Sequence, residues 1–143
     1  MTTEKAILEA LQKGVIAAVA ASSEPTLAIK CAGISLTKPN NGKGWLEIIH
    51  IPNNVTNEFW GDGKTHRGIM RLILYWPIDG QGAYPPITLI ESIAAYFYKG
   101  LKLVDVGNTV SVSINDNPNF MGILEETPEV LYPVSIRYQF FKA

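Results

Sequence analysis

The sequence predicts one α+β domain, spanning residues 1–143, in which a mostly antiparallel sheet of four to six strands packs against two helices. Two segments carry apolar side chains at helical spacing, several others alternate apolar with polar side chains, and Gly/Pro-rich turns separate them. Each helical segment has one apolar stripe. A sheet with one face against both helices is the simplest way to bury those stripes.

The first predicted helix begins at Thr2 or Thr3, either of which can cap it. Its apolar face consists of Ile7, Leu8, Leu11 and Val15. The second predicted helix covers residues 87–99, and Gly100 supplies its stop signal. The buried stripe of this helix consists of Ile90, Ile93, Ala94 and Phe97.

Strands are predicted over 27–32, 45–51, 68–76, 110–114 and 134–140, with a short edge strand over 120–124. Segment 45–51 is apolar at nearly every position, which predicts cover on both of its faces. This segment and 68–76 form an adjacent antiparallel pair, joined by the long polar loop 52–67. Pro128 and Pro133 are predicted to lie in the link before the last strand. The side of strand 68–76 that faces the helices consists of Met70, Leu72, Leu74 and Trp76.

The composition bears on assembly. Charged residues make up 17% of the chain, whereas soluble proteins average about 25%. Either the core is large, or neighbouring subunits cover part of the apolar surface, as in obligate oligomers. The net charge of −1 argues against a nucleic-acid coat protein, which needs a dense field of Lys and Arg. The single cysteine, Cys31, is predicted to be a small buried hydrophobe, and it suits a reducing cytoplasm.

The sequence contains no recognisable catalytic or cofactor motif. Gly63-Lys64-Thr65 resembles the end of a phosphate-binding loop, but Glu58 stands where that loop requires glycine. His50 is interpreted as a core or interface residue, and His66, in the predicted loop, as solvated or at an interface. Neither has the spaced partners of a metal site. We therefore predict no enzyme, no metal and no cofactor. No apolar run approaches the roughly 20 residues that span a membrane.

The loop 52–67 carries Phe59 and Trp60 side by side among Asn and Gly residues. Large aromatic side chains are costly to leave in water, which leaves two interpretations. They fold back onto the subunit's own core, or they anchor the loop on a neighbouring subunit or on a partner protein, since Trp and Arg are typical interface hot spots. The second interpretation predicts an interface formed by Phe59, Trp60, His66, Arg67 and Arg71.

Several segments resemble the tail terminator, or tail completion, proteins of long-tailed phages. They are Phe59 to Gly63, His66 to Pro77, the turn Asp79 to Gly82 before the second helix, and Tyr132 to Tyr138. The early helix and the strand Gly44 to Ile48 fall in the places that the family leads one to expect. The resemblance covers nearly the whole chain, but residues 22–44 match only loosely. Its motifs are patterns of fold rather than catalytic signatures.

The resemblance implies a virion protein that assembles in the host bacterial cytoplasm into a homo-hexameric ring. Such a ring caps the tail tube, stops its polymerisation and presents a surface to the head–tail connector proteins. DNA would pass through the ring without specific binding. Two alternatives remain: a head–tail connector or stopper of the same particle, and a small-molecule-binding or enzymatic α+β domain.

Overall fold

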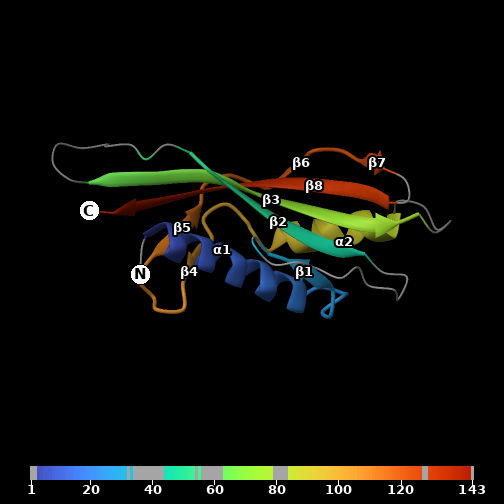
Figure 1. The fold of residues 1–143 in the computed structure, drawn as a ribbon, viewed down its shortest axis with the longest axis horizontal. Coiled ribbons are helices and arrows are strands. Elements are labelled where there is room, and N and C mark those ends of the chain that lie inside the picture. Colours follow the sequence, from blue (N-terminus) through green and yellow to red (C-terminus); the bar gives the residue numbers. More distant parts are fainter. Residues whose placement is uncertain are drawn as a thin grey trace.

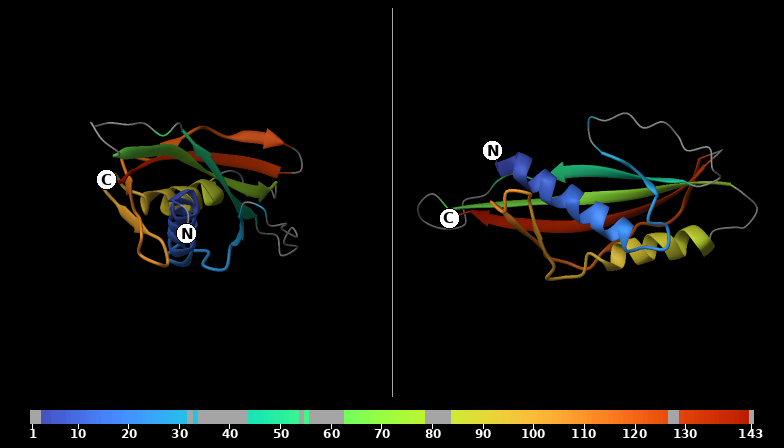
Figure 2. Two further views of the ribbon diagram at one scale, coloured as in Figure 1. Left: turned by 60° about the vertical axis from the view of Figure 1, so that its left-hand side comes forward. Right: turned by 90° about the horizontal axis from the view of Figure 1, so that it is seen from below.

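The computed structural model describes residues 3–31, 33, 44–53, 55, 63–78, 84–126 and 129–142. Within these residues the chain forms two helices, α1 (Thr3–Ala20) and α2 (Tyr84–Ala95). The strands, in chain order, are β1 (Ala28–Lys30), β2 (Trp45–Pro52), β3 (Lys64–Pro77), β4 (Lys102–Val104), β5 (Ser111–Ile114), β6 (Asn119–Phe120), β7 (Leu124–Glu126) and β8 (Glu129–Lys142). Both helices lie on the same side of one sheet (Figure 1; Figure 2, left). This confirms the α+β class and the one-sided packing.

The sheet is larger and less uniform than predicted. Among the described residues it has eight strands, in the order β1-β2-β3-β8-β5-β4, with β6 and β7 also paired to β8. The β1–β2 pair is parallel, and all other pairs are antiparallel. The predicted edge strand 120–124 is replaced by two separate strands, β6 and β7, and β4 was not predicted; each of the three has three residues or fewer. Segments this short contain too few residues to display an alternation of apolar and polar side chains, which explains why the predicted number of strands was too low.

Strands β3 and β8 pair over fourteen residues, from Lys64 opposite Lys142 to Pro77 opposite Glu129. Both strands are longer than the predicted 68–76 and 134–140, and Pro133 lies inside β8 rather than in the preceding link. The carbonyl of Pro133 accepts a hydrogen bond from Met121 N at 3.0 Å. The N and C=O of one residue point to the same side of a strand, so the missing N–H faces β6 and costs the β3 pairing nothing.

Helix α2 begins three residues before the predicted start and ends at Ala95, not at Lys99. Its end is a tight turn in which Phe97 N donates to Ala94 O at 2.9 Å. Gly100 does adopt a positive φ of 98°, but its N–H donates to Ile114 O in β5 at 2.7 Å. Gly100 therefore connects the turn to the sheet instead of capping the helix, and α2 ends before Phe97, the last residue of its apolar stripe.

The core lies between the helices and one face of the sheet. Met70, Leu72, Leu74 and Trp76 are buried there with Ile90, Ile93 and Phe97, as predicted. In α1, Ile7, Leu11 and Val15 are buried, whereas Leu8 is half-buried. Cys31 packs against this core while remaining partly accessible.

The prediction that β2 is covered on both faces is wrong for this subunit. Leu46 and Ile48 face the helices and are buried, but Ile51 is 41% exposed and Ile49 is half-buried. The reason is that both helices pack against the same face. The apolar residues on the opposite side of β2 thus have no helix over them.

Leu72 tests the assigned face of β3. Its side chain is fully buried, so Leu72→Ala should lower the free energy of unfolding by about 2–5 kcal/mol. The neighbouring Ile73, half-buried on the opposite face, is the matched control, and Ile73→Ala should cost clearly less. Urea denaturation measures both. A loss of stability below about 1 kcal/mol for Leu72→Ala would show that Leu72 is assigned to the wrong face of the sheet.

Candidate functional site

The sheet has a second face that neither helix covers. Alternate residues of β3 and β8 point away from the core, and the pairing aligns them in rows across the sheet. One row joins Ile51, Ile69 and Arg137, and the next joins Ile49, Arg71 and Ser135. We call this side the open face; its central members are Ile49, Ile51, Arg67, Ile69, Arg71, Ile73, Ser135 and Arg137. Basic and branched apolar side chains therefore share one accessible surface.

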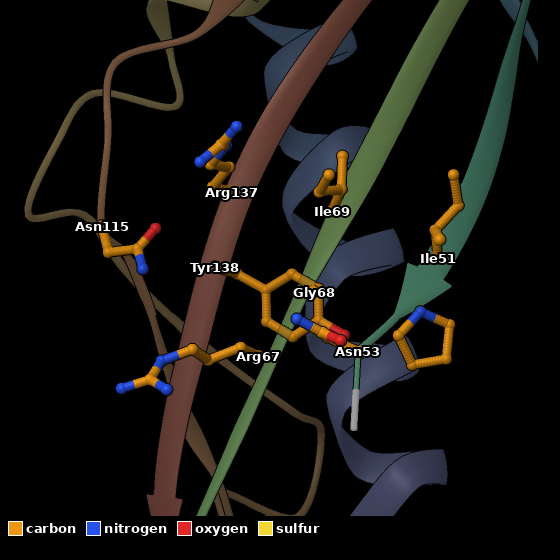
Figure 3. A pocket seen from close by; sticks show the side chains of 9 residues that line it. Ile51, Asn53, Arg67, Gly68, Ile69, Asn115, Arg137 and Tyr138 are labelled. Atoms are coloured by element: carbon orange, nitrogen blue, oxygen red, sulfur yellow. The ribbon is translucent and has the colours of Figure 1, made fainter. Parts of the chain in front are cut away.

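A groove lies on this face, near the ends of β2 and β5. We call it the arginine groove. Its volume is about 470 Å³ and its lining residues are Ile51, Pro52, Asn53, Arg67, Gly68, Ile69, Asn115, Arg137 and Tyr138. Figure 3 shows the guanidinium groups of Arg67 and Arg137, carried by the neighbouring strands β3 and β8. The groove thus combines two cationic groups with apolar walls from Ile51 and Ile69.

Backbone hydrogen bonds hold two asparagine residues at the rim of the groove. Asn53 N donates to Arg67 O at 2.8 Å, which holds Asn53 beside β3 just beyond the end of β2. Asn115 N donates to Arg137 O at 3.2 Å, which holds Asn115 beside β8 just beyond the end of β5. The lining is therefore attached to the sheet at both rims.

Gly68 on β3 allows the strands on either side of it, β2 and β8, to be bridged beneath the groove. The Tyr138 hydroxyl on β8 reaches past Gly68 on β3 and shares a hydrogen bond with His50 Nε2 on β2 (Figure 3 shows the Tyr138 ring beside Gly68). A Cβ atom at Gly68 would lie 2.5 Å from the Tyr138 hydroxyl and 2.7 Å from Ile51 O. Burial raises the pKa of Tyr138, aided by the charge of Glu4. Burial also lowers the pKa of His50, against the opposing effect of Glu4. Both groups therefore remain neutral near pH 7.

The other end of the open face is acidic. Trp45 and Tyr75 stack there, with ring centroids 4.8 Å apart and planes 6° apart. The Tyr75 hydroxyl donates to Glu47 Oε1 at 2.8 Å, and Lys30 Nζ lies 3.7 Å from Glu47 Oε2. Burial raises the pKa of Tyr75, followed by the bond to Glu47 and the charges of Glu47, Glu126 and Glu129. Carboxylates thus cluster at the end of the open face that lies away from the arginine groove.

Beside this end, β7 and the turn before it expose apolar side chains next to carboxylates. Ile123 is 43% and Leu124 53% exposed, and Glu125 and Glu126 follow directly and are exposed. The two glutamates lie in β7. We call residues Ile123 to Glu126 the acidic edge.

The structure separates the five predicted interface residues. His66 lies in β3, not in a loop, because β3 begins at Lys64. Its side chain faces α1, where Nδ1 lies 3.0 Å from Glu4 Oε1, and it is only 11% exposed. Arg67 and Arg71 lie on the open face. Phe59 and Trp60 lie outside the described residues.

Sequence reasoning missed Arg137 as a partner of Arg67. The alternation of the last strand marked it as an outward polar position, but only the pairing of that strand with β3 brings the two arginines to one groove. Asn53 and Asn115 reach the rim of the groove through backbone hydrogen bonds to β3 and β8, which no local sequence pattern expresses.

Neither a metal-binding cluster nor a membrane-spanning helix is present among the described residues. No group of three or more His, Cys, Asp or Glu side chains among them could hold a metal ion. No helix in the part of the chain that the structure describes is long and apolar enough to cross a membrane.

A sheet that is covered on one face, with isoleucine and arginine side chains on the other, is typical of a subunit that packs against other protein. The sequence profile of the phage tail terminator protein family matches residues 6–138, so this chain belongs to that family of structural tail proteins. This confirms the resemblance found in the sequence. No curated protein matches the chain.

Two of the solved structures that share the fold illustrate the likeness. One superimposes with a TM-score of 0.78 at 18% identity, over 98% of this chain and 96% of its own. The other belongs to the virion of a native gene transfer agent particle, with a TM-score of 0.60 at 12% identity, over 99% of this chain and 98% of its own. At these identities the likeness concerns the fold.

Gly68 provides a test of the bridge under the groove. Gly68→Ala should lower the free energy of unfolding by about 1–3 kcal/mol, because the new methyl group meets backbone and a buried hydroxyl. Gly107→Ala is the matched control, since a Cβ there has only ordinary contacts at 3.6 Å. Thermal or urea denaturation measures both. Equal stability of the two variants would contradict the close packing at Gly68.

The same bridge predicts a pH dependence. The pKa of His50 is lowered in the folded state, so its contribution is complete above the unfolded value of about 6.5 and is lost as the pH falls through the folded value. The free energy of unfolding should therefore decrease between about pH 7.5 and 5.5, and less so in His50→Phe. Identical slopes for both proteins would show that His50 does not titrate as described.

Proposed function

We propose that this chain is the subunit of a homo-hexameric ring that caps the phage tail tube, stops its polymerisation and offers a surface to the head–tail connector proteins. Family membership supports this proposal, and so does the low content of charged residues, 17%. The ring would assemble in the host cytoplasm and remain in the tail of the virion.

The open face is the observation that carries the proposal. Its isoleucines are half-buried or exposed, and its arginines are presented on a rigid sheet. In a monomer, such a surface would leave apolar area in water on the side opposite the helices. Contacts between subunits, or with the tube protein, would remove that area from solvent.

The charge of the chain supports a ring through which DNA passes without being bound. The net charge of the chain is −1, and the arginines of the groove are balanced by carboxylates elsewhere on the sheet. A protein that grips DNA neutralises many phosphates with a dense basic field. A ring of these subunits would thus let DNA pass without specific binding.

A head–tail connector or stopper of the same particle is the second candidate. Such a protein would also expose a face for assembly, and the open face alone does not separate the two. Phe59 and Trp60 remain proposed contact residues of either assembly, on the sequence argument given above.

Two measurements test the proposal. Light scattering across a dilution series should show a particle of six times the 15.7 kDa subunit mass, and short tail tubes should gain the same mass when the chain is added. Added to polymerising tube protein, the chain should shorten the tubes in proportion to its concentration. A stopper would bind head connectors and leave tube length unchanged. A chain that stays monomeric on tubes and does not bind them would contradict a ring that caps the tube.

A further inference from the structure

We propose that the arginine groove of one subunit receives the acidic edge of the next copy of this chain, so that one repeated head-to-tail contact closes the ring. This inference rests on the proposed ring and names the surfaces that form it.

The two surfaces match in chemistry. The groove presents the guanidinium groups of Arg67 and Arg137 between apolar walls. The acidic edge presents two carboxylates directly after two exposed apolar residues. Guanidinium groups bind carboxylates through two parallel hydrogen bonds, and the apolar side chains of both surfaces would leave water together. Charge and apolar area are thus both complementary.

The two surfaces also lie apart on the subunit. Arg137 pairs with Ile69, whereas β7 pairs with β8 at residues 129–131, six or more positions away. At about 3.3 Å per residue this separation is about 20 Å along β8, too far for one subunit to bring its own edge into its own groove. Figure 1 shows β7 near one end of the long sheet.

A contact between two different patches is heterologous. It does not produce a two-fold dimer, and it joins subunits into a closed ring or an open filament, depending on the rotation between them. A ring that caps a tube needs this kind of contact. The position of the two patches is therefore compatible with the proposed assembly.

One further observation favours a protein neighbour on these surfaces. Among the described residues, β7 pairs with β8 alone, so its other edge presents unpaired backbone groups, which proteins commonly cover.

Charge reversal tests the contact. We would prepare one variant with Arg67→Glu and Arg137→Glu, and a second with Glu125→Arg and Glu126→Arg. All four residues are exposed, so both variants should fold, which circular dichroism verifies. Each variant alone would bring like charges together and should lose the hexamer, under the conditions in which the original chain forms it.

Mixing the two variants gives the decisive result. The reversed groove of the first matches the reversed edge of the second, and the unchanged groove and edge match as well. An equimolar mixture should therefore restore hexamers with alternating subunits, detected by light scattering and native mass spectrometry. The controls Glu91→Arg and Lys99→Glu change exposed charges outside both surfaces and should assemble normally.

The outcomes separate the two proposals. If the original chain forms no ring even on tubes, the proposed function fails. If it forms rings and the reversed variants do too, this contact is wrong. If the groove variant forms rings but no longer binds tubes, the groove belongs to the tube protein and the inference is overturned. Variants that lose the ring but do not recover on mixing also overturn it.

Discussion

The long pairing of β3 with β8 is the constraint on which the rest of this structure depends. Fourteen residue pairs in one register decide, for both strands at once, which side chains face the helices. A shift of the register by one residue would move Leu72 and Val134 to the open face and Arg71 to the core. The buried core and the accessible arginines are thus two results of the same alignment.

The bridge from Tyr138 to His50 stabilises this alignment across three strands. It requires glycine at position 68, because any larger side chain would occupy the path of the tyrosine ring. The backbone of the same glycine lines the arginine groove. A residue that contributes no side chain therefore permits the close fit between three strands.

The sequence predicted what periodic patterns can express and missed what depends on pairing. Alternation in 68–76 placed Leu72 and Trp76 correctly in the core, and the stripe of the second helix placed Phe97 correctly although the helix ends before it. The strand of His66 was missed, because Lys64 to Arg67 are polar and resemble a loop. The arginine groove could not be predicted from the sequence, since Arg67 and Arg137 are 70 positions apart and only the pairing of β3 with β8 brings them together.

One-sided packing has a consequence for assembly. With both helices on one face, the chain has no further element among its described residues to cover the other, and apolar residues such as Ile51 remain accessible. A neighbour that covers this face with its own acidic edge would use two surfaces that no helix of the subunit occupies. Because these surfaces differ and lie apart along the sheet, each added subunit would leave one of each kind free until the ring closes. In the closed ring, both surfaces of every subunit would be occupied by a neighbour. Addition of subunits would then end at a particle of defined size, on which a tube could stop.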